Sequence, residues 1–342
     1  MRRRSIMKIR RRNIIGLLLS LMLLLCGCGE EQGTTGAIDH KTPVNDGGTI
    51  VVGVSQVGSE SVWRSANSKS VQEVFTKENG YYLIFDNARQ KQENQVKAIR
   101  NFISLQVDYI VFSPITEDGW ETVLKEAKDA GIPVILMDRK LENKYDGLYT
   151  TWVGSDFYGE GVKAGRWLED YLGDKTEQVN MVVLKGTKGA SSMIGRTKGF
   201  QDVAKEHSNW KILEEADADY TTAKGEEEME RLLKTYPDID VLVSQNDDMT
   251  FGALKAISAA GKSTGVGGEI TVISFDAVKR ALELVEKGVI NLDVECNPNQ
   301  GEKLAEVITR LEKKQNIEKA YYVDEMIFTP EKVGLYIKDR TY

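Results

Sequence analysis

Polar and charged residues follow the apolar runs that we expect to form strands. They are Glu60, Ser61, Trp63 and Arg64 after Val54, Asp138 and Arg139 after Met137, Asn246 after Val243, Asp276 after Ser274, and Glu295 after Val294. Asp, Asn and Ser at strand ends can simply cap the next helix. Capping does not explain Arg64, Arg139 and Arg196, because arginines do not cap helix N-termini and rarely lie near buried crevices unless they are paired or bind a ligand.

These residue types suit a sugar ligand. Sugar hydroxyls both donate and accept hydrogen bonds, so carboxylates and planar guanidinium groups can bind them in bidentate geometry. Aromatic rings can stack on the apolar face of a sugar, and Trp63 and Tyr220 are the aromatic candidates. The alternative for both rings is ordinary packing in the core or on the surface, with no contact to a ligand. The set as a whole predicts a binding site for a monosaccharide.

The same sequence offers little for catalysis. Its histidines, His40 and His207, are not placed for a Ser-His-Asp or Cys-His site. The glycine run at 265–268 stands ahead of an expected strand, whereas a dinucleotide-binding loop follows one. We find no Walker-type loop and no convincing metal-ligand spacing. We therefore expect no enzyme, no cofactor and no metal, with a glycosidase using paired carboxylates as the enzymatic alternative.

The elements that must position these residues alternate between strand-like and helix-like segments. The expected strands are Thr49–Val54, Tyr81–Phe85, Tyr109–Phe112, Pro133–Met137, Val179–Leu184, Lys211–Leu213, Val241–Val243, Ile270–Ser274 and Ile290–Val294. Amphipathic segments such as Val62–Lys77, Lys91–Ser104 and Glu121–Ala130 separate them. This alternation is typical of parallel α/β sheets, whose ligands bind at the carboxyl ends of the strands. A chain of 342 residues exceeds one core, so we predict two doubly wound lobes.

The N-terminal segment has the pattern of a signal peptide. Seven basic residues without an acid precede the apolar run 14–25, which is too short to span a bilayer. The sequence Leu25-Cys26-Gly27-Cys28 resembles a bacterial lipobox, which implies lipidation of Cys28 and removal of residues 1–27. Residues 28–48 are rich in Gly, Thr, Asp and Glu and predict a flexible tether. We therefore expect an extracytoplasmic protein anchored to the cell membrane, with Met1 or Met7 as its start.

Charge and cysteine content narrow the partners further. The net charge is −7, and loss of the basic signal leaves about −14, which argues against nucleic acid. Cys296 is the single cysteine of the globular region, so no intramolecular disulfide is expected there. A lone cysteine of this kind is typically a small buried apolar residue.

Several segments resemble the sugar-binding proteins of bacterial ABC transporters, in the group of galactofuranose- and ribose-binding proteins. They include Gly53–Arg64, Arg89–Gln95, Gly189–Ser191, Arg196–Phe200, Asn246–Met249 and Phe275-Asp276. The resemblance implies a type I periplasmic-binding fold, in which two α/β lobes joined by three chain crossings close on a sugar, here a furanose such as galactofuranose. Tyr220 replaces a phenylalanine of the family, and Pro114–Asp118 differs from the galactofuranose type.

The resemblance also implies which residues contact the sugar and where the two lobes begin and end. Glu60, Ser61, Trp63 and Arg64 look like first-lobe contacts, Asp138 and Arg139 lie at the first crossing, Arg196, Asn246 and Asp276 look like second-lobe contacts, and Glu295 lies near the second crossing. The lobes are expected at 49–140 plus 296–325 and at 141–295 plus 326–342. The implied partners are a monosaccharide and ABC permease subunits, with the protein itself a monomer. A sensory partner of a membrane kinase or chemoreceptor is the alternative. A LacI-like repressor is rejected, because a signal and a tether stand where its helix-turn-helix would be.

Overall fold

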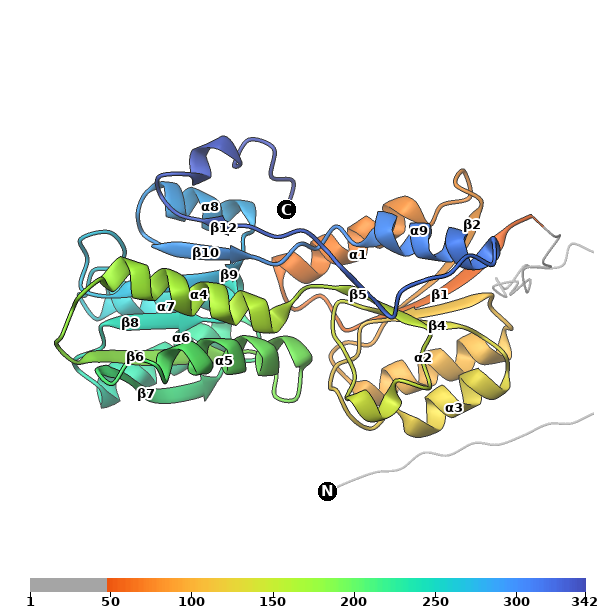
Figure 1. The fold of residues 1–342 in the computed structure, drawn as a ribbon, viewed down its shortest axis with the longest axis horizontal. Helices are drawn as coiled ribbons and strands as arrows, with labels where there is room; N and C mark the ends of the chain where they lie inside the picture. The colour runs from red at the N-terminus through yellow and green to blue at the C-terminus, as the bar shows by residue number, and fades with distance from the viewer. Residues whose placement is uncertain (1–47) are drawn as a thin grey trace, which may run out of the picture. The chain divides into compact units, whose positions relative to one another are not determined.

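The computed structural model describes residues 48–342, which form two six-stranded sheets. The strand order is β11-β5-β4-β3-β1-β2 in the first sheet and β12-β10-β9-β8-β6-β7 in the second. Figure 1 shows that helices cover both faces of each sheet. The predicted class, two doubly wound α/β lobes, is confirmed. Cys28 and the predicted tether lie outside the described residues, apart from the residue at position 48.

The first lobe is built around a parallel sheet, which has one layer of apolar side chains on each face. Its elements are β1 (Ile50–Gln56), α1 (Val62–Val74), β2 (Tyr81–Asn87), α2 (Gln92–Ser104), β3 (Tyr109–Phe112), α3 (Glu121–Asp129), β4 (Val134–Met137), the short 3-10 helix at Asn143–Tyr145, β5 (Thr151–Gly154), α9 (Gly301–Glu312) and β11 (Ala320–Tyr322). Side chains alternate between the faces of a strand. Ile110 therefore packs with the α2 and α3 residues, and Val111 packs with those of α1 and α9.

The second lobe repeats this arrangement. Its elements are α4 (Phe157–Leu172), β6 (Val179–Lys185), α5 (Ser191–Ala204), β7 (Trp210–Asp217), α6 (Thr222–Thr235), β8 (Val241–Ser244), α7 (Asp247–Ala259), β9 (Thr271–Asp276), α8 (Lys279–Glu286), β10 (Leu292–Glu295), β12 (Ile327–Phe328) and a second 3-10 helix at Val333–Leu335. Leu242 packs toward α6, α7 and α8, and Val243 packs toward α4 and α5. All strand pairs are parallel except β10 with the short edge strand β12.

The chain passes between the two sheets after β5, after β10 and after β11. The predicted lobe boundary after residue 140 is wrong, because β5 pairs with β4 in the first sheet. The first crossing therefore follows Gly154, and Asp138 and Arg139 lie at the end of β4 rather than at a crossing. The strand β5 has only four residues and follows a polar loop, so its apolar signal in the sequence is weak.

Every predicted strand is present. The observed ends differ from the predicted ends by at most two residues, except in β7, which extends to Asp217. The strands β5, β11 and β12 were not predicted. All three are two to four residues long and lie near or at a sheet edge. Among residues 48–342, no helix has the length and apolar character needed to cross a membrane.

Candidate functional site

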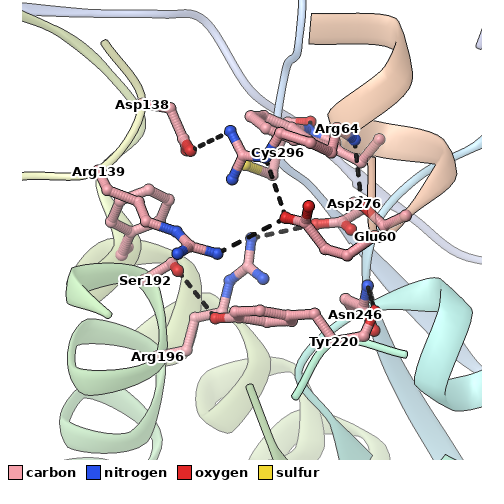
Figure 2. A pocket seen from close by; sticks show the side chains of 13 residues that line it. Glu60, Arg64, Asp138, Arg139, Ser192, Arg196, Tyr220, Asn246, Asp276 and Cys296 are labelled. Carbon is pink, nitrogen blue, oxygen red and sulfur yellow. Dashed lines mark hydrogen bonds and ion pairs between the residues drawn. The ribbon is translucent and has the colours of Figure 1, made fainter. Parts of the chain in front are cut away.

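The two lobes line one pocket at the carboxyl ends of their strands. Its lining consists of Glu60, Ser61, Trp63, Arg64, Asp138, Arg139, Phe157, Ser192, Arg196, Tyr220, Asn246, Asp276 and Cys296. The pocket contains about 290 Å³ of space free of atoms, including the part that opens to solvent. Figure 2 shows Glu60 and three arginines converging at its centre.

The start of α1 brings two first-lobe side chains into the pocket. The hydroxyl of Ser61 accepts a hydrogen bond from the backbone N–H of Arg64 at 3.0 Å and caps the helix. Trp63 and Arg64 therefore lie in the first turn, where both are at least 96% buried. The indole N–H of Trp63 donates to the carbonyl oxygen of Cys296 at 2.6 Å. Because Cys296 lies at the second crossing, this bond ties the aromatic wall to the hinge.

Arg64 is held by two carboxylates. Its Nη1 lies 2.7 Å from Oδ2 of Asp138, and its Nε lies 3.1 Å from Oε1 of Glu60. Burial lowers the pKa of Arg64, but the charges of the two carboxylates outweigh burial and raise it. Arg64 is therefore permanently charged and fixed in orientation.

Arg139 lies deeper and is paired less well. Its Nη1 donates to the carbonyl oxygen of Ile115 at 3.1 Å, and its Nη2 lies 3.9 Å from Oε1 of Glu60. Burial and then the charge of Arg64 lower the pKa of Arg139. Within the described part of the chain, Nε of Arg139 and Oε2 of Glu60 have no hydrogen-bond partner. Two residues of the lining thus each retain a buried polar atom whose hydrogen-bonding capacity is unused.

The second lobe supplies Arg196 from α5. Its Nε lies 2.6 Å from Oε2 of Glu160, its Nη2 lies 3.3 Å from Oδ1 of Asp276, and its Nη1 donates to the carbonyl oxygen of Gln245. Burial raises the pKa of Asp276 well above its usual value, against the lowering effect of Arg196. These contacts fix the guanidinium at the floor of the pocket.

Tyr220 forms an aromatic wall with a polar edge. Its hydroxyl and that of Ser192 are hydrogen-bonded at 2.8 Å, and the guanidinium of Arg139 lies 5.5 Å from the ring centroid. The ring lies over Gly186, where an added Cβ would come within 1.8 Å of a ring carbon. A glycine at this position is therefore required by the close approach of Tyr220.

Three pocket residues have a left-handed backbone: Asp138, Tyr220 and Asp276, with φ of 61°, 60° and 104°. Non-glycine residues rarely adopt this conformation, and it concentrates at functional sites. Below Asp276, the backbone N–H groups of Ala277 and Val278 donate to the buried carboxylates of Asp293 and Asp247 at 3.1 and 2.8 Å. This network holds the turn that presents Asp276.

The lining has equal numbers of basic and acidic side chains. Three arginines, Arg64, Arg139 and Arg196, face three carboxylates, Glu60, Asp138 and Asp276. Sites for anionic ligands carry an excess of cations. The balanced lining, with its aromatic walls, fits a neutral polyhydroxyl compound.

The pocket brings together ten of the eleven ligand-binding residues predicted from the sequence. Glu295 is the exception. Its carboxylate pairs with Nη1 of Arg340 at 2.6 Å and accepts from the backbone N–H of Met326 at 3.0 Å. The C-terminal segment therefore holds Glu295 away from the lining, and its predicted contact role is withdrawn.

Sequence reasoning missed three lining residues: Phe157, Ser192 and Cys296. Phe157 opens α4, which follows the unpredicted strand β5. Ser192 adjoins the segment Gly189–Ser191 and precedes Arg196 by one helical turn, so helical spacing could have identified it. Cys296 was interpreted as an ordinary buried residue, and it is buried, but it also faces the pocket.

Comparisons with known proteins agree with this geometry. Residues 51–316 match the family model of the periplasmic binding protein domain. The galactofuranose-binding protein YtfQ of Escherichia coli is 42% identical over 253 residues, which cover 73% of this chain and 78% of that protein. Such relatives are binding proteins, which confirms the prediction that the chain is not an enzyme.

Two solved structures are similar over almost their whole length. A Mycobacterium smegmatis protein in complex with β-D-fucofuranose has a TM-score of 0.82 and 38% identity, covering 86% of this chain and 96% of that one. The binding component of an arabinose ABC transporter from Shewanella, bound to L-arabinofuranose, has a TM-score of 0.79 and 38% identity, covering 85% and 95%. The predicted two-lobed periplasmic-binding fold is confirmed.

Proposed function

Because this chain belongs to the periplasmic binding protein family, we propose that it captures a monosaccharide in its furanose form outside the cytoplasm and delivers it to an ABC importer. The observation that carries the proposal is the pocket with equal numbers of arginines and carboxylates, whose lining residues Arg139 and Glu60 each have a buried polar atom without a hydrogen-bond partner among the described residues. A neutral ligand with neighbouring hydroxyls can donate to the carboxylate and accept from the guanidinium.

The furanose form is supported by the similar solved structures, which contain fucofuranose and arabinofuranose. Delivery to an importer is supported by the relative that is the binding component of an arabinose ABC transporter. Closure on the sugar requires that both lobes contact it, because a ligand favours only the state that it binds better. The lining meets this condition, since Arg64 comes from the first lobe and Arg196 from the second.

Ring-locked sugars test the furanose proposal directly. The compounds 1,4-anhydro-D-galactitol and 1,5-anhydro-D-galactitol hold the furanose and the pyranose ring and cannot interconvert. We expect the furanose compound to raise the melting temperature by several degrees at 100 times its Kd, because a ligand of the folded state stabilises it by about 2.7 kcal/mol there. Thermal shift measurements with both compounds, galactose and arabinose give the comparison.

An equal or larger shift with the pyranose compound would refute the furanose form. No shift with any of these sugars, or with a wider set of pentoses and hexoses, would refute sugar binding itself. The sugar recovered from the protein should also be chemically unchanged, since the relatives are binding proteins.

The lipid anchor is part of the proposal and depends on Cys28. We expect Cys28→Ser to move the protein out of the membrane fraction or leave it unprocessed, because the lipidated thiol is lost. Cys26→Ser is the matched control and should fractionate as the parent does, since residue 26 is removed with the signal. Membrane fractionation and N-terminal mass measure both. An unchanged distribution and mass for Cys28→Ser would exclude the anchor.

A further inference from the structure

Three acidic side chains meet where the chain crosses between the lobes. Glu160 lies on α4 just after the first crossing, Cys296 follows β10 at the second, and Glu325 lies between β11 and β12 at the third. One thiol or carboxylate atom of each lies within 4.8 Å of the others. The cluster adjoins the sugar pocket through Cys296, which Figure 2 shows among the lining residues.

The contacts of the cluster leave ligand atoms available. Glu160 is fully buried, and Arg196 binds its Oε2 at 2.6 Å, yet its Oε1 has no hydrogen-bond partner among residues 48–342. Glu325 accepts from the backbone N–H of Asn297 at 3.0 Å. A buried carboxylate oxygen without a donor is costly unless something positive approaches it.

The donor set defines the class of ion. Thiolate sulfur selects soft and borderline metals, whereas carboxylate oxygen accepts harder ones. A mixed set of one thiolate and two carboxylates therefore suits zinc, which binds Cys and Asp or Glu and, in its open type of site, has three protein ligands and one free position. Calcium and magnesium prefer oxygen ligands alone.

We propose that Glu160, Cys296 and Glu325 bind a divalent metal ion of the zinc class at the hinge. Cys296 borders both the cluster and the pocket, and Glu325 is only partly buried. The hydroxyl of Ser155 lies 3.3 Å from the sulfur of Cys296 and adjoins the cluster. An ion bound here ties together all three crossings, so its occupancy adjusts how easily the lobes open.

A structural alternative is that a proton alone satisfies the cluster, with the carboxyl groups sharing it. Cadmium separates the two possibilities, since a cadmium–thiolate bond gives an ultraviolet charge-transfer band that a proton cannot produce. We therefore titrate the full chain, purified in detergent, with Cd²⁺ and follow this band, with Zn²⁺ as the competitor. The expected result is one Cd²⁺ per chain, displaced by Zn²⁺.

Three variants locate the ion. In the processed protein, which lacks Cys26 and carries lipid on Cys28, Cys296 is the single free thiol, so Cys296→Ser should abolish the band. Glu325→Gln should weaken Cd²⁺ binding at least about tenfold, because it removes one anionic ligand without changing size. Asp324→Asn removes the same charge at the exposed neighbouring position and should leave binding unchanged.

The proposal fails if no band appears, if the band persists in Cys296→Ser, or if Glu325→Gln binds cadmium as tightly as Asp324→Asn does. Circular dichroism on each variant confirms that the fold is intact. Should Cys296→Ser not fold, the comparison of Glu325→Gln with Asp324→Asn still decides the matter. The experiment uses no sugar, so its outcome is independent of the proposed transport function.

Discussion

Arg196→Met is expected to lower the free energy of unfolding by about 3–5 kcal/mol, because it strands two buried carboxylates. Arg196 is 97% buried, and its guanidinium is the partner of Glu160 at 2.6 Å and of Asp276 at 3.3 Å. Methionine fills a similar volume, so the loss reports the missing charge and hydrogen bonds rather than a cavity. Urea denaturation measures it.

The loss of unfolding free energy in Arg196→Met should become larger as the pH rises. Burial already raises the pKa of Glu160 and Asp276, and removing Arg196 removes an interaction that lowers both. A carboxyl group with a raised pKa in the folded state stabilises the fold at low pH and loses that contribution as pH rises. The variant should therefore be weaker relative to the parent at pH 8 than at pH 5.

Arg166→Met is the matched control. Arg166 makes comparable ion pairs with Glu206 and Glu169, but its side chain is 46% exposed. Exposed ion pairs contribute little, so this variant should unfold almost as the parent does at both pH values. If Arg196→Met is no less stable than Arg166→Met, the buried pairs do not support the second lobe.

The strands and the site were predictable from the sequence to different degrees. Strands such as β3, β4 and β8 are short apolar runs bounded by polar residues, and each was found close to its predicted ends. The pocket followed from them, because parallel strands end at one edge of a sheet and the residues after each strand must gather there.

What the sequence did not reveal depends on contacts between distant segments. β5 and β11 pair with each other at the edge of the first sheet, although the paired residues Trp152 and Ala320 are 168 positions apart in the sequence. Glu295 follows a strand as Asp276 does, and only the return of the C-terminal segment with Arg340 removes it from the pocket. No local pattern carries this information.

The cluster of Glu160, Cys296 and Glu325 was not predicted from the sequence for the same reason. Glu160, Cys296 and Glu325 lie at or next to three different crossings, so no spacing in the sequence resembles a ligand motif. Metal motifs are recognised from sequence when their ligands share one helix or loop. Here the topology alone assembles the ligands, and the sequence therefore predicted no metal.

Arg139→Met should weaken sugar binding roughly 10- to 100-fold without reducing stability. Charge-assisted hydrogen bonds contribute about 1.5–3 kcal/mol each, and every 1.4 kcal/mol is about tenfold in Kd. The unpartnered Nε of Arg139 is available for such a bond with a sugar hydroxyl. Calorimetric titration with the tightest-binding sugar of the screen measures the change.

Stability should behave differently from that of Arg196→Met, because Arg139 is buried with poor compensation. The carboxylate of Glu60 lies 3.9 Å from its Nη2, and burial and then the charge of Arg64 lower the pKa of Arg139. The free-energy penalty of burying such a charge exceeds the gain from its ion pair, so replacing it with an apolar side chain of similar volume can be neutral or stabilising. Urea denaturation of Arg139→Met should give a free energy of unfolding equal to or above that of the parent.

The control is Arg100→Met, which removes an exposed arginine paired with Glu126 on the first lobe and should change neither affinity nor stability. Unchanged affinity in a folded Arg139→Met would show that the guanidinium does not contact the sugar. A large loss of stability would show that Arg139 is a structural residue like Arg196. Retained stability with lost affinity identifies Arg139 as a group that the fold keeps charged and poorly paired until the sugar supplies its partner.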